Sequence, residues 1–297
     1  MIDRDKVVLF NAIEGGSKFW CEELIRLGAS ELIERILADF YLDQRKSAER
    51  IKNKILNSNS DELYEQISNS GSRFITKESS EWPGALNDLA APPIGLIVKG
   101  NEIEGNAVAI VGTRNPTIYG AKIASQFAAG FSDRDWRVVS GGAYGIDTHA
   151  HRGAIAAEGK TFAVLASGVS INYPAGNERL FAEICETGAL ISEVMPNEKA
   201  RQDRFLTRNR IIAAMTQGTI VVEAAFRSGS LRTARDAAEL MRIVMAVPGP
   251  ISSPTSDGCH RLIGERCAEI VTSVSDALEL LMPLAPLITS TLGADVT

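Results

Sequence analysis

The sequence predicts an α/β protein in which a doubly wound, mostly parallel sheet follows a small helical domain. From residue 106 onward, six short and almost continuously apolar runs alternate with helix-length segments. Such runs are typical of parallel strands that are buried on both faces. Earlier in the chain, apolar residues recur at spacings of three and four, which indicates helices. We therefore expect a helical domain at residues 1–70, the sheet domain at 71–283 and a flexible tail at 284–297.

In the amino-terminal region, the stretch WCEELIRLGASELIERIL (20–37) has the helical spacing, and the polar stretch NSNSDE (57–62) separates two further helical pieces. Through residue 65 this region has 10 basic and 13 acidic residues, so it offers no evident surface for a nucleic acid. Beyond residue 71, Pro92 and Pro93 are among the prolines that forbid one continuous helix. We expect extra strands and turns there, leading into the sheet.

The six apolar runs define the expected parallel strands. They are AVAIVG (107–112), WRVVSG (136–141), TFAVLA (161–166), ALISEV (189–194), TIVVEA (219–224) and IVMAVP (243–248). Ligands of doubly wound sheets bind outside the carboxyl ends of the strands. The loops that follow these runs therefore hold the candidate functional residues.

Composition and charge narrow the classes of function. No apolar run approaches the roughly 20 residues that cross a bilayer, and the first residues lack the zones of a signal peptide. We therefore expect a cytoplasmic protein with no membrane partner. The four cysteines form no CxxC pair and are too sparse to staple a fold of 297 residues, which suits a reducing compartment. The formal net charge of −6 excludes a chain coated with basic groups.

Basic residues are nevertheless concentrated between residues 201 and 242, where eight arginines and four acidic residues give a local net charge of +4. The remainder of the chain then carries −10. From composition alone, a set of solvated helix faces is the more ordinary interpretation of such a cluster. Its position beside strand ends shifts the balance toward a binding surface.

Two loops after predicted strands have the chemistry of a phosphate site. After the first strand, Arg114 stands where a dinucleotide-binding fingerprint has its second glycine, so the pattern is not that fingerprint. Arginine suits phosphate by charge and fork geometry, although an ion pair with a neighbouring helix is the alternative. In SGGAYGID (140–147), glycines free backbone amides to converge on an anion, and Asp147 is placed to cap the next helix. Tight packing of helix on strand is the alternative explanation of those glycines.

A later segment points to the same edge of the sheet. In FLTRNRII (205–212), Arg208 and Arg210 lie on a helix that leads into the fifth strand. After that strand, the turn AFRSGSLRTA (225–234) opens another helix, whose amino end attracts phosphate. Three loops of this kind on one edge describe a binding site.

No spacing of residues indicates a metal site. His149 and His151 point about 200° apart on a helix, so they cannot easily chelate one ion from a single face, and a structural role is expected. Cys259, His260 and Cys267 lack the spacing of a metal finger. We therefore assign no metal.

Catalysis is not indicated either. Glu193 and Glu223 end their strands without a recognisable partner, so hydrogen bonding to a neighbouring loop is their expected task. The chain shows no paired carboxylates and no nucleophile beside a histidine. We predict a binding protein that is not an enzyme and uses no cofactor.

Taken together, the motifs resemble the DNA-processing protein A (DprA, also called Smf) family. In order, they are GTR (112–114), SGGAYGID (140–147) with AH (150–151), YPAGN (173–177), ISE (191–193), FLTRNRIIA (205–213), VVEA (221–224), SGSLRTA (228–234), VPG (247–249) and DGCHRLI (257–263). Nine ordered motifs between about 75 and 283 make the resemblance highly specific. Many members continue with a winged-helix domain, and we expect none after residue 283 here.

The resemblance implies an extended Rossmann-like fold that binds single-stranded DNA in a basic pocket and assembles as a homodimer. It implies protection of incoming single strands and loading of the RecA recombinase onto strands held by single-stranded-DNA-binding protein, during natural transformation and recombination. Carried over by motif, the DNA-contacting residues are Arg114, Ser140, Gly141, Gly142, Ala143, Tyr144, Arg208, Asn209 and Arg210, with Ser228, Ser230 and Thr233 as weaker candidates.

Two other functions stay open. Nucleotide phosphoribohydrolases of the lysine-decarboxylase-like (LOG) group have a similar fold and a PGGxGTxxE loop, whereas the loop here is EAAFRSGSLRTA (223–234), with Glu223 before the turn. A Rossmann-fold sensor that binds a small nucleotide fits the same phosphate-binding loops. Tyr144 or Phe226 offers a ring for stacking on a base, with partial burial among the loops as the alternative.

Overall fold

The computed structural model describes residues 4–282. Its first part consists of the helices α1 (Arg4–Ala12), α2 (Lys18–Leu27), α3 (Ala29–Leu37), α4 (Arg45–Leu56) and α5 (Ser60–Asn69). The polar break expected at 57–62 separates α4 from α5, as predicted, because the Asn59 side chain accepts hydrogen bonds from the backbone N–H groups of Asp61 and Glu62 and caps α5.

The following chain forms a nine-stranded sheet with the order β1-β2-β6-β5-β4-β3-β7-β8-β9. The strands are β1 (Arg73–Ile75), β2 (Leu96–Gly100), β3 (Ala107–Val111), β4 (Arg137–Ser140), β5 (Thr161–Leu165), β6 (Ala189–Ser192), β7 (Gly218–Val221), β8 (Ile243–Ala246) and β9 (Glu269–Ile270). Strands β3 to β9 are parallel, and β1 and β2 add an antiparallel edge beside β6. The predicted fold class and all six predicted strands are confirmed.

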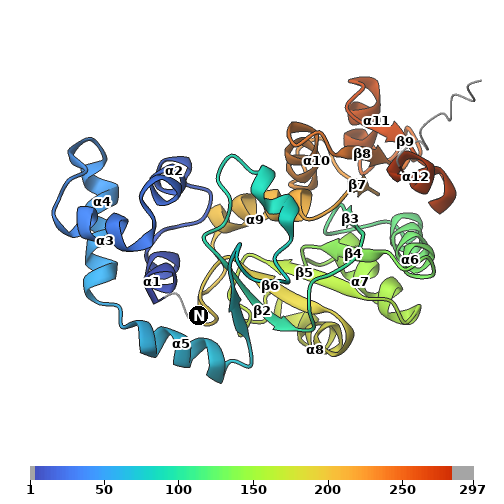
Figure 1. The fold of residues 1–297 in the computed structure, drawn as a ribbon. Coiled ribbons are helices and arrows are strands. Elements are labelled where there is room, and N and C mark those ends of the chain that lie inside the picture. Colours follow the sequence, from blue (N-terminus) through green and yellow to red (C-terminus); the bar gives the residue numbers. More distant parts are fainter. Residues whose placement is uncertain (1–3, 283–297) are drawn as a thin grey trace, which may run out of the picture.

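The sheet is covered by the helices α6 (Ile118–Ser132), α7 (Ile146–Ala156), α8 (Glu178–Thr187), α9 (Gln202–Ala214), α10 (Ser230–Glu239), α11 (Asp257–Gly264) and α12 (Val274–Leu281). Figure 1 places α9 and α10 on one side of the sheet and α6, α7 and α8 on the other. Helix α6 begins at Ile118, because the Thr117 hydroxyl accepts a hydrogen bond from the Gly120 amide at 3.1 Å and caps the helix.

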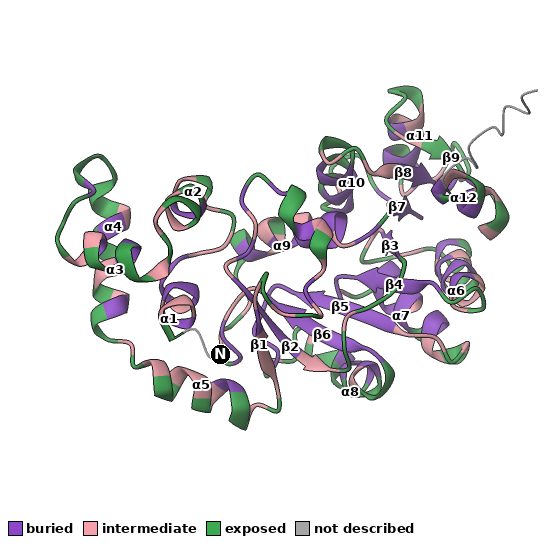
Figure 2. Cartoon of the chain, in the orientation of Figure 1, coloured by how far each residue is buried: buried purple, intermediate pink, exposed green. Residues whose placement is uncertain are grey.

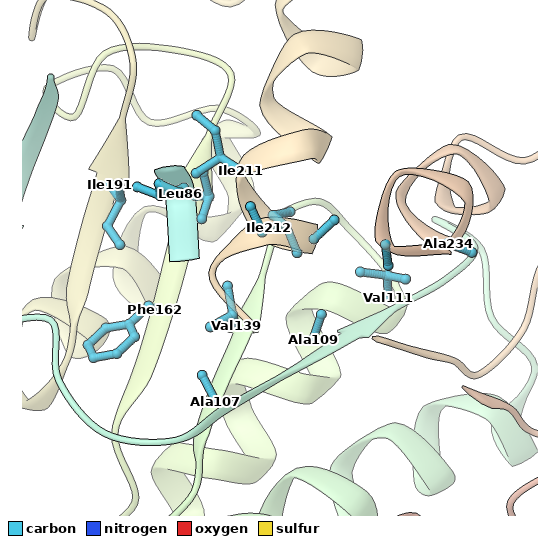
Figure 3. Packing of buried hydrophobic residues seen from close by; sticks show 14 of the residues in the cluster. Leu86, Ala107, Ala109, Val111, Val139, Phe162, Ile191, Ile211, Ile212 and Ala234 are labelled. Carbon is cyan, nitrogen blue, oxygen red and sulfur yellow. The ribbon is translucent and has the colours of Figure 1, made fainter. Parts of the chain in front are cut away.

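Alternate residues of β3 build two separate cores. Ala109 and Val111 pack in a cluster with Ile211 and Ile212 of α9, as Figure 3 shows. Ile110, which points the other way, joins a cluster with residues of α6, α7 and α12. This two-sided burial is why the strand sequences are apolar throughout, and Figure 2 shows the central strands buried along their length.

The helical segment is packed onto the sheet through a shared core. Val7 and Phe10 of α1 lie in one cluster with Ile97 of β2, Leu165 of β5 and Phe181 of α8. The boundary at residue 70 stays a prediction, and the expected tail at 284–297 lies outside the described residues. Between residues 4 and 282, none of the helices has both the length and the apolar character that crossing a membrane requires.

The path of the chain fixes where a ligand site can form. From β3 the chain proceeds outward through β4, β5 and β6, and it then returns to place β7 on the opposite side of β3. The loops after β3 and β7 therefore leave the sheet in different directions. Such a switch point opens a crevice at the carboxyl ends of the two strands.

Candidate nucleic-acid interface

A cavity of about 240 Å³ lies at this switch point. Its lining comes from the loop after β3, the glycine turn after β4 with the first turn of α7, one side of α9, and the start of α10. The lining residues are Val111, Gly112, Arg114, Ala143, Asp147, Phe205, Leu206, Arg208, Asn209, Ile212, Ser228, Gly229, Ser230 and Thr233. Seven of the residues predicted to contact DNA thus share one cavity: Arg114, Ala143, Arg208, Asn209, Ser228, Ser230 and Thr233.

Arg114 offers an available cation at the mouth of the cavity. Its side chain is exposed, and it forms no ion pair with any residue in the range 4–282. Its guanidinium lies 5.1 Å from the ring centroid of Phe205, a cation–π arrangement. The alternative of an ion pair with a neighbouring helix is therefore not what the structure has.

Arg208 is a buried cation in the wall of the cavity. It is 7% exposed and donates hydrogen bonds from Nη1 to the carbonyl oxygens of Gly141, at 2.6 Å, and Val164. These carbonyls lie at the ends of β4 and β5, so Arg208 reaches the ligand edge as predicted. Burial lowers the pKa of Arg208 to about 10, with Asp147 opposing this effect and Arg114 adding to it.

The glycine turn differs from the prediction. Asp147 does not cap α7, whose N-cap is Gly145 without a side-chain hydrogen bond. Its Oδ2 instead accepts the backbone N–H groups of Gly141 and Ala143 at 3.1 and 3.3 Å. These two amides are therefore not free for an external anion, because the carboxylate of the same motif already occupies them. Burial raises the pKa of Asp147, against the opposing charge of Arg208.

Only part of the turn reaches the surface. Ser140, Gly141 and Gly142 are buried, and the Ser140 hydroxyl donates to the Ile110 carbonyl at 2.7 Å. Tyr144 is half-exposed, and its hydroxyl accepts a hydrogen bond from the Gly176 amide at 3.2 Å. DNA contact by the buried part of the turn stays a prediction, and the geometry gives that part a supporting position beneath the cavity.

Arg210 lies apart from the cavity. It donates to the Ala91 carbonyl at 2.9 Å and forms an ion pair with Glu193, which follows β6. Burial raises the pKa of Glu193, and Arg210 counters that shift. Both charges of this pair are already compensated, so the predicted DNA contact of Arg210 has no geometric support.

The start of α10 supplies neutral donors. Ser228 Oγ and Ser230 Oγ are 2.8 Å apart, and Thr233 lies one turn into the helix. The Asn209 side-chain amide donates to the Gly229 carbonyl at 3.4 Å, which ties α9 to this loop. Because the amino end of α10 faces the cavity, its dipole adds positive potential there.

Most of the arginine cluster between residues 201 and 242 is committed to ion pairs. The paired arginines are Arg201, Arg204, Arg210, Arg232 and Arg242. Among the described residues, Arg208, Arg227 and Arg235 have no such pair. Most of the cluster therefore belongs to solvated helix faces, as its composition alone suggested. The candidate site depends on Arg114 and Arg208.

The glutamates and histidines are held in structural contacts. The Glu223 carboxylate accepts the Thr117 amide at 2.9 Å and the Thr117 hydroxyl at 2.6 Å, which confirms the predicted bonding to a neighbouring loop. His151 is buried and shares a 2.7 Å hydrogen bond with Thr161 Oγ1, and burial lowers its pKa to about 3. No group of three or more potential metal ligands occurs in residues 4–282.

Aromatic residues beside the arginines were not assigned from the sequence. The Phe205 ring lies 5.6 Å from that of Tyr173, in the loop after β5, and Phe205 also lies under Arg114. Tyr173 is 46% exposed. The sequence could have indicated Phe205, because it lies three positions before Arg208 and therefore on the same face of the helix. Its neighbour Tyr173, in the motif YPAGN, comes from a distant part of the chain and could not be inferred in this way.

Comparisons with known proteins show a match to one family. A family model described as DNA recombination-mediator protein A matches residues 73–282. A relative named putative DNA processing protein DprA, from Mycobacterium tuberculosis strain H37Rv, is 45% identical over 224 residues, which are 70% of this chain and 57% of the relative. The chain thus spans little more than half of that relative.

Solved structures extend the comparison to the whole fold. DNA processing protein A from Streptococcus pneumoniae superposes with a TM-score of 0.79 at 30% identity and covers 94% of this chain and 98% of its own. The protein of that name from Helicobacter pylori, whose structure describes its mode of binding single-stranded DNA, gives a TM-score of 0.64 at 27% identity over 71% of this chain and 97% of its own. From the matched family model and the shared fold, this chain belongs to the DNA recombination-mediator protein A family.

Proposed function

We propose that this chain binds single-stranded DNA in the cavity at the β3/β7 switch point. The observation that carries the proposal is the pairing of an exposed, uncompensated Arg114 with the buried Arg208 in one cavity. Arginines and helix amino ends hold phosphates without selecting a base sequence. Single-stranded DNA binding by the Helicobacter pylori relative supports the same ligand.

The aromatic residues suit the bases of such a strand. Phe205 and Tyr173 present neighbouring rings next to Arg114, so one strand could place a phosphate on the guanidinium and a base on a ring. Stacking contributes about 1–3 kcal/mol per base and tolerates any sequence. In this proposal the direct contacts come from the cavity residues, with Tyr144 at the rim and Ser140, Gly141 and Gly142 holding the turn in place.

The proposal includes no catalytic step. The carboxylate of Asp147, which lines the cavity, and that of Glu223 are already occupied by backbone amides and a hydroxyl group. From its family we further propose a cytoplasmic homodimer that protects incoming single strands and loads the RecA recombinase onto strands held by single-stranded-DNA-binding protein. Light scattering tests the dimer, because a monomer at micromolar concentration would contradict it.

The first test is fluorescence anisotropy of labelled oligo-dT titrated with wild type and with Arg114→Ala at several salt concentrations. Loss of one charge-assisted phosphate contact should weaken binding at least about tenfold at low salt. It should also reduce the slope of log affinity against log salt by about 0.7. Arg114 is exposed, so the variant should retain its fold.

Arg235→Ala is the matched control, because Arg235 is exposed on α10 and has no ion pair within residues 4–282. Equal weakening by both substitutions would indicate general surface charge rather than the cavity. Competition by a mononucleotide separates the remaining alternatives. If a mononucleotide displaces the strand at equal affinity and with a shallow salt slope, the site belongs to a nucleotide sensor.

A further inference from the structure

Glu14 links the helical segment to α9. It lies in the loop between α1 and α2, where its Oε1 is 3.1 Å from Arg201 Nη1 and its Oε2 is 3.6 Å from Arg204 Nε. The following Gly15 approaches so closely that a Cβ there would lie 2.3 Å from the Glu193 carboxylate. A Cβ at Gly16 would lie 3.1 Å from Thr207 Cγ2 of α9. The loop is therefore seated between the end of β6 and the amino-terminal half of α9.

Arg204 and Arg201 follow Arg208 toward the amino end of α9. Arg204 precedes Arg208 by one helical turn, about 6 Å along the axis, and Arg201 precedes it by about two turns, roughly 10 Å. Arg204 and Arg208 share one helix face at this spacing, and Arg201 is the N-cap residue of α9. A small cavity of about 60 Å³ is lined by Glu14, Asp203, Arg204 and Thr207 together with Arg208, which also lines the DNA cavity. A strand that leaves the DNA cavity along α9 thus meets Arg204 and Arg201 next.

Three carboxylates, those of Glu14, Glu198 and Asp203, face the two arginines here, so the charges balance only with Lys54, whose Nζ lies 4.0 Å from Glu14 Oε1. Arg204 pairs with Glu198 at 2.8 Å, and Arg201 pairs with Asp203 at 2.6 Å. The Arg204 side chain is 8% exposed, yet its buried Nε has no hydrogen-bond partner, because the Glu14 oxygen at 3.6 Å is too distant. An anion that approaches closer than Glu14 would satisfy this donor.

We propose that Arg201 and Arg204 form a second phosphate subsite for the strand held in the cavity, and that Glu14 occupies this subsite in the free protein. The inference rests on the proposed function. A phosphate of the bound strand replaces the Glu14 carboxylate, so DNA must compete with a charge of the helical segment. Glu14 thereby lowers affinity for longer strands.

The test is Glu14→Gln, which keeps the size of the side chain and removes its charge. With a long oligo-dT, the variant should bind about three- to tenfold tighter than wild type at low salt. Its salt slope should be steeper by about 0.7 for each additional phosphate that the protein neutralises. Glu49→Gln is the matched control, since Glu49 is exposed on α4 and has no ion pair among residues 4–282. It removes the same charge from the same segment.

Arg201→Gln distinguishes a phosphate subsite from an ion pair with Glu14 that only stabilises the fold. In the Glu14→Gln background it should abolish the increase in affinity, and alone it should weaken long strands while leaving a trinucleotide unaffected. Unchanged or weaker binding by Glu14→Gln, with normal wild-type binding and normal circular dichroism, would overturn the subsite alone. Absence of wild-type binding would instead overturn the proposed function on which it rests.

Discussion

Asp147 has a larger role in the candidate site than its sequence motif indicated. Its carboxylate holds two amides of the glycine turn and faces the buried charge of Arg208. The sequence showed that an acid follows the glycines, and the ordinary use of that position is a helix cap. Its actual role follows from α9, which brings a buried arginine next to it from more than 60 residues further along the chain.

Substitution of Asp147 should therefore cost stability. Asp147→Ala leaves two amides without an acceptor and a buried arginine without its counter-charge, and we expect a loss of about 3–5 kcal/mol in the free energy of unfolding. Asp147→Asn keeps an acceptor and should cost less. Urea denaturation measures both values, and an equal cost for the two variants would show that the hydrogen bonds contribute nothing.

Other residues mark the limit of prediction from sequence. Arg114 was predicted from its place directly after the first strand and Arg208 from its place on the helix that leads into the fifth strand, and both line the cavity. Arg210 carries the same local signal as Arg208. Its partners, Glu193 and the Ala91 carbonyl, are contributed by distant segments, so only the folded structure reveals that it is occupied.

At the scale of elements, the parallel strands were predictable because burial on both faces leaves no polar position in them. Strand β9 (Glu269–Ile270) escaped notice because two exposed residues make no pattern. The caps decide where helices begin. At α12, Ser273 and Asp276 form a reciprocal capping box, in which each side chain accepts the backbone N–H of the other residue.

The capping box predicts a pH dependence. Hydrogen bonds from Ser273 and Thr272 lower the pKa of Asp276 from its ordinary 3.8 to about 2. A carboxylate whose pKa is lowered by folding stabilises the protein above the unfolded value and loses that contribution as pH falls through the folded value. The difference in stability between wild type and Asp276→Asn should thus shrink as the pH drops from about 4 to about 2, measured by thermal unfolding. A difference that is constant over this range would contradict the cap.

At the scale of the whole molecule, the helical segment and the sheet share one core. Phe10 of α1 lies in the same cluster as strand residues, and the loop at Glu14 pairs with α9. Sequence periodicity predicted a helical part and a sheet part as separate domains. It could not reveal their shared core, because periodicity reports local structure and not the packing between parts.

This shared core predicts cooperative unfolding. Trp20 reports on the helical segment and Trp136 on the sheet, so single-tryptophan variants allow each part to be followed by fluorescence in urea. The two transitions should coincide. Phe10→Ala, which removes about 3–5 kcal/mol of packing, should shift both together. A shift of the Trp20 signal alone would show that the parts unfold independently.

The placement of β7 beside β3 also determines when the cavity is completed during synthesis of the chain. Strand β3 ends at Val111, but its neighbour on the other side, β7, begins only at Gly218. A ribosome must therefore add more than a hundred further residues before the second wall of the cavity exists. Every nascent chain shorter than this lacks the β7 loop and the start of α10, so the cavity is completed late in synthesis.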